Sequence, residues 1–337
     1  MRCQVLALVA IFLAASTGGA AAIDCAKAKS GIEKAICADP AVKAADDAMA
    51  ATYQDMLGRL DASAAAMLKD NQLQWLKLRE DRCSGTAADA LSRCLIAVSE
   101  ERARYLSGMP QSGPGITPSP MPATLSRAES KTQCGAEVAT YVFPQDGAPG
   151  LAVFNQAIDA LSKNLEAEYG ARMAEEEGFE YHCYYALDTH FTFTSPVLIA
   201  AANDISMYTG GAHGMYSSQS LIIDVAKGRT LVFGDVFPEA AQGPIAAMCS
   251  ASLLEEKRAR LGGMGMSDAE IVTEMAGYDE TVGKAVPDFS RWMIYADRAE
   301  IYFGPYELGS YAEGPYTCTI PAAELAKLAT SGSWIAE

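Results

Sequence analysis

The sequence lacks long apolar runs and the motifs of the commonest enzyme classes. Its longest apolar run, from Val5 to Ala15, is far shorter than the roughly 20 residues of a membrane-spanning helix. No G-x-S-x-G, H-E-x-x-H or P-loop motif occurs, so hydrolase, zinc-protease and nucleotide-binding functions lack their usual signatures. We therefore expect a protein with no membrane anchor and no cofactor that is not an enzyme.

Histidine is scarce, and its placement argues against a metal site. The three histidines are His182, His190 and His213. If the first two share one straight strand, they lie about 26 Å apart at about 3.3 Å per residue, too far to bind one ion. No C-x-x-C pair occurs, and the cysteine spacings match no zinc pattern. We expect no metal.

The N-terminus has the pattern of a secretory signal. Arg2 precedes the apolar run, and small residues ending at Ala22 follow it. The pattern predicts a signal peptide over residues 1–22 and a mature chain that starts near Ile23. We expect this chain in the periplasm of a Gram-negative bacterium, or secreted.

Eight cysteines follow the signal peptide, in two sets of four. Even sets in an exported protein are typical of disulfides, and the gap between the sets predicts that each half closes its own pairs. Four cysteines allow three pairings, so the connectivity within each half stays open. The sets are Cys25, Cys37, Cys83 and Cys94, then Cys134, Cys183, Cys249 and Cys318.

Proline and glycine are concentrated between the two cysteine sets, where five prolines alternate with three glycines from Ser107 to Pro122. Because proline lacks a backbone donor and favours extended geometry, we expect a semi-rigid linker over residues 108–124 that belongs to neither core. The linker would separate a domain over residues 23–107 from a domain over residues 125–337.

Charge is divided unevenly between these domains. Residues 23–107 contain 12 Lys+Arg and 13 Asp+Glu, whereas residues 125–337 contain 13 and 29, a balance of −16. A field of this sign repels nucleic acid and anionic lipid, and it speeds encounter with a cationic protein. Solubility alone would also explain it.

The first domain has helical periodicity. Asp39 and Pro40 supply an N-cap and a first helical position, and apolar residues then recur every three or four positions as far as Leu60. Further helices are predicted from Ser63 to Arg82 and from Ala87. Short connections make neighbouring helices antiparallel, which would bring the four thiols to one end. We expect an all-α domain stapled by disulfides.

The second domain contains strand and helix patterns in separate blocks. The segments with a strand pattern are 137–143, 181–194, 197–208, 219–225, 230–233, 292–303 and 316–320. Helical patterns cover 151–176, 240–261 and 267–282, and a short helix is predicted from Ala322. Because the blocks are segregated rather than alternating, the predicted class is α+β with an antiparallel sheet.

Residues of the first domain have a distinctive spacing. They are Asp24–Lys27, Glu33–Asp39, Tyr53, Gln72–Trp75, Arg79, Cys83, Cys94–Leu95, Arg102 and Leu106. This spacing resembles the N-terminal domain of LprI-type lysozyme inhibitors, which implies a lysozyme as partner. Trp75 and Arg79 lie one turn apart, which favours a packed indole with a stacking arginine over a binding site.

Two motifs stand out in the second domain. They are Tyr208–Gly214 and Phe303–Glu307, the latter continuing to Tyr311–Gly314. With Asp224, Gly228, Asp235 and Phe237, they resemble the lysozyme-sensing extracellular domain of the anti-sigma factor RsiV. The resemblance implies a binding module for lysozyme or the cell wall. The membrane anchor and sigma-binding segment of that sensor are absent from the sequence.

The same motifs contain the candidate partner-binding residues. These are Tyr208, His213, Tyr306, Glu307, Tyr311 and Glu313. Tyrosines bury a large area with little loss of entropy, and carboxylates suit the arginine-rich surface of a lysozyme. Alternatively, His213 holds its glycine-rich turn through a hydrogen bond to a neighbouring carbonyl, and the tyrosines cover the edge of the core.

These observations favour a periplasmic lysozyme-binding protein that inhibits lysozyme-like muramidases through acidic-surface and loop contacts. A non-catalytic scaffold that binds peptidoglycan would share the same features. The rival class is a carbohydrate-active or peptidoglycan-modifying enzyme, because paired carboxylates such as Glu300 and Glu307 leave no sequence signature.

Overall fold

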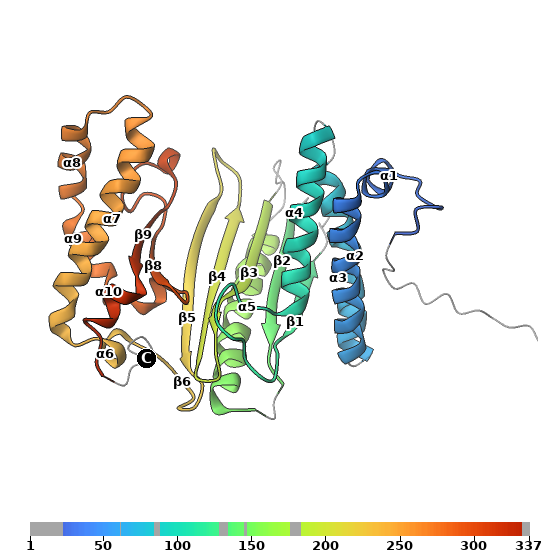
Figure 1. The fold of residues 1–337 in the computed structure, drawn as a ribbon, viewed down its shortest axis with the longest axis horizontal. Helices are drawn as coiled ribbons and strands as arrows, with labels where there is room; N and C mark the ends of the chain where they lie inside the picture. The colour runs from blue at the N-terminus through green and yellow to red at the C-terminus, as the bar shows by residue number, and fades with distance from the viewer. Residues whose placement is uncertain are drawn as a thin grey trace, which may run out of the picture.

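The computed structural model describes residues 23–60, 62–83, 88–127, 134–144, 147–175 and 183–331. The expected signal peptide lies outside these residues. A bundle of helices is followed by a sheet backed by one long helix, and then by a second group of helices and strands (Figure 1).

The N-terminal part is helical, as predicted. It contains α1 (Gly31–Ala38), α2 (Pro40–Arg59), α3 (Ala62–Cys83) and α4 (Ala88–Ser107). The start of α2 is confirmed, since the Asp39 carboxylate accepts hydrogen bonds from the first backbone N–H groups of the helix. The short helix α1, which starts at a Ser30–Glu33 capping box, was not predicted.

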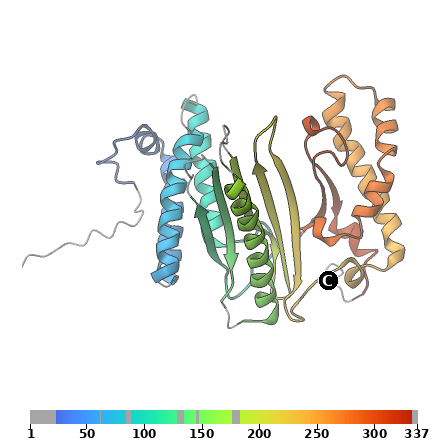
Figure 2. The same ribbon diagram turned by 180° about the vertical axis from the view of Figure 1, so that it is seen from behind.

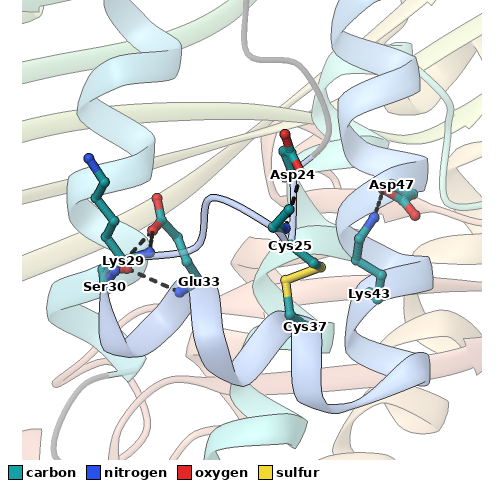
Figure 3. The surroundings of a disulfide bond; sticks show 9 residues. Asp24, Cys25, Lys29, Ser30, Glu33, Cys37, Lys43 and Asp47 are labelled. Carbon is teal, nitrogen blue, oxygen red and sulfur yellow. Dashed lines mark hydrogen bonds and ion pairs between the residues drawn. A yellow bond between two sulfur atoms is a disulfide. The ribbon is translucent and has the colours of Figure 1, made fainter.

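The disulfides confirm that each half closes its own pairs. Figure 3 shows the bridge that ties the segment before α1 to the last turn of that helix, next to the capping box. In the helical part, the second bridge joins the end of α3 to α4, and both bridges lie at the same end of the bundle. The four pairs are Cys25–Cys37, Cys83–Cys94, Cys134–Cys183 and Cys249–Cys318.

A buried ion pair and a stack of cations hold the helical core. Arg79 donates to Asp46 over 2.6 Å, and both side chains are almost completely buried. The Arg79 guanidinium lies 5.0 Å from the centre of the Trp75 ring, and that of Arg102 lies 5.6 Å from it. The packed indole with a stacking arginine is therefore confirmed.

A six-stranded sheet follows, in the order β1-β2-β3-β4-β5-β6. Neighbouring strands are antiparallel except β2 and β3, which are parallel and joined by α5 (Pro149–Glu175). Helix α5 covers one face of the sheet (Figure 2). The strands are β1 (Met121–Arg127), β2 (Cys134–Val142), β3 (Cys183–Thr194), β4 (Leu198–Tyr208), β5 (Met215–Asp224) and β6 (Arg229–Thr230).

The segment predicted as a linker does not behave as a spacer, because it packs against the sheet. Gln111 donates its backbone N–H to the Phe191 carbonyl over 2.8 Å, and Ile116 is buried in the core between the sheet and α5. Gly113 permits the close approach, since a side chain there would meet the Thr194 carbonyl at 2.5 Å. From Met121 onward the chain forms β1, so the proline-rich composition was misleading.

The C-terminal part confirms the α+β class and departs from the predicted boundaries in places. The expected strand at 230–233 is wrong beyond Thr230, because a helix begins at Phe233. The helix expected over 267–282 is interrupted at Gly277. The elements are α6 (Phe233–Val236), α7 (Gln242–Gly262), α8 (Asp268–Ala276), α9 (Asp279–Ala285), β7 (Trp292–Ile294), β8 (Arg298–Phe303), β9 (Tyr316–Pro321) and α10 (Ala322–Ala326), with β7, β8 and β9 forming a second, antiparallel sheet.

Candidate partner-binding site

Two loops from different sheets meet and bring both sequence motifs together. One connects β4 to β5 and carries His213, and the other connects β8 to β9 and carries Tyr306 and Tyr311. The imidazole of His213 stacks on the Tyr311 ring with 3.6 Å between the ring centres. Its Nε2 atom lies 3.1 Å from the Tyr306 hydroxyl. We call His213, Tyr216, Tyr306 and Tyr311 the aromatic cluster, since Tyr216 packs edge-on against Tyr311.

The carbonyl of Gly214 fixes the geometry of the cluster. It accepts a hydrogen bond from the Tyr311 hydroxyl over 2.7 Å and lies 3.0 Å from Nδ1 of His213. A carbonyl only accepts, so Nδ1 of His213 donates to it. The interpretation of His213 as a holder of its turn is therefore confirmed. Gly214 has no room for a side chain, because a Cβ would meet the Met207 carbonyl at 2.9 Å.

Tyr306 is the most exposed tyrosine of the cluster. Its side chain is 58% exposed, and its backbone has a φ of 71°, a conformation that bulky residues rarely adopt. Tyr208, from the β4 end of the other loop, donates its hydroxyl to the Gly211 carbonyl over 3.0 Å and stacks on Tyr184. Tyr208 thus supports the loop, while Tyr306 and His213 present their rings to solvent.

The two glutamates of the predicted acidic loop are engaged in the fold. Glu307 accepts from the Gly304 backbone N–H over 2.6 Å and from Arg291 over 2.8 Å. Glu313 accepts from the Ser310 backbone N–H over 2.7 Å and from the Tyr316 hydroxyl over 2.8 Å. Their carboxylates stabilise the loop rather than forming its outer surface.

The environment of Glu313 strongly favours its charged form. Burial alone would raise the pKa of its carboxyl, but the hydrogen bonds from Ser310 and Tyr316 outweigh burial, and with the charge of Lys257 they lower the pKa to about 2. Arg260 reinforces the same loop by donating to the carbonyls of Glu313 and Pro315, over 2.7 Å in each case.

Sequence reasoning missed Lys257, which lies in α7. Its ammonium group is completely buried, 2.7 Å from Glu274 and 3.3 Å from Glu313, and it lies over the rings of Tyr278 and Tyr316. A lysine in the middle of an amphipathic helix ordinarily indicates a solvated face, so its position gave no signal. Lys257 connects α7 and α8 to the loop that presents Tyr306 and Tyr311.

The remaining candidates do not assemble into a catalytic or metal site within the described part of the chain. Glu300 accepts from Arg298 over 2.6 Å and Glu307 from Arg291, so both proposed carboxylates are paired with arginines. His190 lies in β3, whereas His182 is outside the described residues. No group of three His, Cys, Asp or Glu side chains there has the geometry to hold a metal ion. None of the helices described is both long and apolar enough to cross a membrane.

Two family models match parts of the chain, one in each half. The model described as "Lysozyme inhibitor LprI" matches residues 25–106, which run from Cys25 to the last turn of α4. Residues 25–106 are an LprI domain. A second model, for a protein family of unknown function called DUF3298, matches residues 235–323. The DUF3298 match contains Tyr306 and Tyr311, whereas His213 lies before it.

Two solved structures that are similar to part of this chain carry the second family name. A DUF3298 family member from Bacteroides fragilis is 18% identical, with a TM-score of 0.45 over 65% of this chain and 95% of that one. A DUF3298 protein from Pseudomonas aeruginosa is 15% identical, with a TM-score of 0.42 over 63% and 93%. No curated protein matches the chain. The LprI match supports lysozyme inhibition in general.

Proposed function

We propose that the protein is a periplasmic or secreted inhibitor that binds lysozyme-like muramidases through the aromatic cluster, with the LprI domain contributing to the complex. The observation that carries this proposal is the convergence of two loops, from two different sheets, on one exposed pair of rings, His213 and Tyr306. Rigid, amphipathic rings of this kind are favoured anchors of protein interfaces.

The rigidity of the cluster supports a role in binding. His213 and Tyr311 both donate to the Gly214 carbonyl, and Lys257 and Arg260 hold the second loop from beneath. A surface whose side chains are already fixed loses little conformational entropy when a partner covers it. The resemblance to the RsiV extracellular domain, which involves the same two loops, points to lysozyme as that partner.

The charge distribution supports a cationic partner. The acidic balance of −16 falls entirely in residues 125–337, the part that carries the aromatic cluster. Because Glu307 and Glu313 are occupied within the fold, long-range attraction would come from the whole domain rather than from these two carboxylates. Such attraction raises the association rate more than it slows dissociation, and salt screens it.

The proposal is tested by adding the purified protein to a c-type lysozyme and following lysis of cell walls. We expect slower lysis, salt-sensitive association, and a loss of affinity of at least tenfold in Tyr306→Ala, about the effect of removing one interface anchor. Met264→Ala is a matched control, since Met264 is 72% exposed and lies in the turn between α7 and α8.

The other classes predict different results in the same experiment. Release of sugar or peptide from peptidoglycan by the protein alone would make it an enzyme. Capture of muropeptides without any effect on lysozyme would make it a wall-binding scaffold. Unchanged lysozyme affinity in both Tyr306→Ala and His213→Ala would show that the aromatic cluster is not the contact surface.

A further inference from the structure

A cavity of about 390 Å³ lies between the LprI domain and the six-stranded sheet. Its helical wall comes from α3 and α4, and its other wall comes from β2, β3 and β4. The volume is within the range of small-molecule sites. Contacts between the walls hold them together, since Tyr141 in β2 donates its hydroxyl to the Tyr105 carbonyl in α4 over 3.0 Å.

The sheet wall is the face that α5 leaves uncovered. Side chains alternate along a strand, and Val138 and Leu187 pack in the cluster that includes Leu165 and Tyr169 of α5. Their neighbours in sequence therefore point to the opposite face. Figures 1 and 2 show α5 on one side of the sheet only.

Three carboxylates meet on this wall. Asp188 in β3 and Asp204 in β4 are directly opposite each other in the strand register, and Ala139 of β2 is opposite Asp188 on its other side. Glu137 lies two residues before Ala139, on the same face and diagonal to Asp188. Like charges placed directly opposite each other in a sheet are destabilising.

None of these carboxylates forms an ion pair with a lysine or arginine within the described part of the chain, although Arg82, Arg102 and Arg104 also line the cavity. Asp188 and Glu137 have neither a hydrogen-bond donor nor an ion-pair partner there. Asp204 lies 3.5 Å from Nδ1 of His190, and burial lowers the pKa of that imidazole although Asp204 acts against the shift. The His190 ring is therefore predominantly neutral at neutral pH.

The helical wall supplies aromatic rings and three arginines. Arg82 is paired with Glu101 over 3.5 Å, and Arg104 is exposed. Arg102 is 6% exposed, and it donates to the side-chain oxygens of Asn71 over 2.6 Å and Gln72 over 3.0 Å. Its guanidinium lies over the rings of Trp75 and Tyr105, which it holds at the edge of the cavity. Its charge acts on Glu137, but it forms no ion pair with the carboxylates of the sheet wall.

We propose that this cavity binds an organic cation, an ammonium or guanidinium group on a short apolar stem, with its charge between Asp188 and Asp204 and its stem against Trp75 and Tyr105. Carboxylates satisfy the charge and donors of such a group, and aromatic rings favour both its cationic head and its stem. The site is distinct from the aromatic cluster, so it does not depend on the proposed function. The cation has two sources to distinguish: a free amine, or a basic side chain of a protein partner.

The test is calorimetric titration of the whole protein with n-butylammonium and methylguanidinium chloride, using n-butanol and N-methylurea as uncharged analogues. We expect the cations to bind and the analogues not to bind. Asp188→Asn and Asp204→Asn should each weaken cation binding at least tenfold. Asp159→Asn should leave cation binding unchanged, because Asp159 is an exposed residue of α5, and α5 lies on the other side of the sheet from the cavity.

A pH series adds a readout that a merely structural role would not change. Burial, with the charge of Asp204, raises the pKa of Asp188 to about 7, and the charges of Glu101 and Glu137 add to the shift. The ionised fraction of Asp188 then rises from about one tenth at pH 6 to about nine tenths at pH 8, so affinity should rise about ninefold. Asp188→Asn should abolish this rise.

The results distinguish a free amine from a basic side chain as the source of the cation, and they test the cavity separately from the aromatic cluster. Tight binding of the small cations supports a free amine. Weak binding, together with weaker association of a c-type lysozyme with Asp188→Asn, supports a basic side chain. Equal binding of cations and uncharged analogues, or unchanged cation affinity in both Asn variants that remain folded by circular dichroism, overturns the proposal. Neither result would affect the role of Tyr306, which is tested separately.

Discussion

Replacing Asp188 by asparagine should make the protein more stable, and only at the upper end of the pH range. The folded-state pKa of Asp188 is about 7, well above its ordinary value of 3.8. The folded protein therefore binds a proton that the unfolded chain releases, and stability falls as pH rises from about 4 to about 7. Asparagine has the shape of the protonated carboxyl and does not ionise, so the variant avoids this loss.

The size of the effect follows from the shift and from the accessibility of the side chain. The difference between a pKa of about 7 in the folded protein and 3.8 in the unfolded chain corresponds to a free energy of unfolding of at most about 4 kcal/mol. Because Asp188 reaches solvent through the cavity, screening reduces this limit, and we expect about 1–2 kcal/mol at pH 8. That gain would raise the melting temperature by about 2–8 °C in a domain of 150–250 residues.

The measurement is urea unfolding of both proteins from pH 4 to pH 8, followed by circular dichroism. Comparing the variant with the parent at each pH cancels the titration of the other carboxylates. Asp159→Asn is the control, since its carboxylate is exposed and pairs only with Lys163 among the described residues. A stability difference that is absent at pH 8, or that has the same size at pH 4 and pH 8, would refute the assignment of Asp188 as an unpaired acid.

Three further predictions concern interactions that hold the scaffold together. Arg79→Ala should lower the free energy of unfolding by about 3–5 kcal/mol in urea titrations, because it leaves the buried Asp46 carboxylate unpaired; a loss under about 1 kcal/mol would contradict this. Glu313→Gln should cost about 2–3 kcal/mol at pH 7, and the difference should vanish as pH falls from about 4.5 to about 2, where the native carboxyl also becomes protonated; a difference that persists at pH 2 would show another cause. Replacing Cys249 and Cys318 together by alanine should lower the free energy of unfolding by about 2–5 kcal/mol, and an unchanged urea midpoint would mean that this buried bridge does not stabilise the fold.

Local signals in the sequence were sufficient to predict the framework. Asp39 and Pro40 locate the start of α2 because a cap and a fixed φ act within one turn. The separation of the cysteines into two even sets predicts pairing within each half, while the actual partners required the structure. The linker prediction failed because prolines and glycines also allow a chain to lie flat against a sheet, as Gly113 does against Thr194.

The candidate site was only partly predictable, because tertiary contacts decide which side chains reach its surface. Both motifs were identified in the sequence together with their resemblance to the RsiV extracellular domain, and the structure brings His213 and Tyr306 together. Whether the glutamate side chains point into the fold or to solvent could not be predicted, because it depends on tertiary partners. Arg291, which lies just before β7, pairs with Glu307. The cavity gave no local signal, because the polar residues of β3 alternate as they would on any solvated face until the LprI domain packs over them.

The position of Arg102 explains why that packing leaves a cavity rather than an interface closed by ion pairs. The charge of Glu137 acts on Arg102 strongly enough to oppose the lowering of its pKa by burial. A guanidinium in this position could close the interface by pairing with the carboxylates. Instead, Asn71 and Gln72 satisfy its donors and keep it against the aromatic rings, so the negative charge of the sheet stays available. Arg102 is buried, whereas Glu137, Asp188 and Asp204 are exposed, so these carboxylates keep contact with water in the isolated protein. A cation that enters from outside would pair with Asp188 and Asp204, with which Arg102 forms no ion pair.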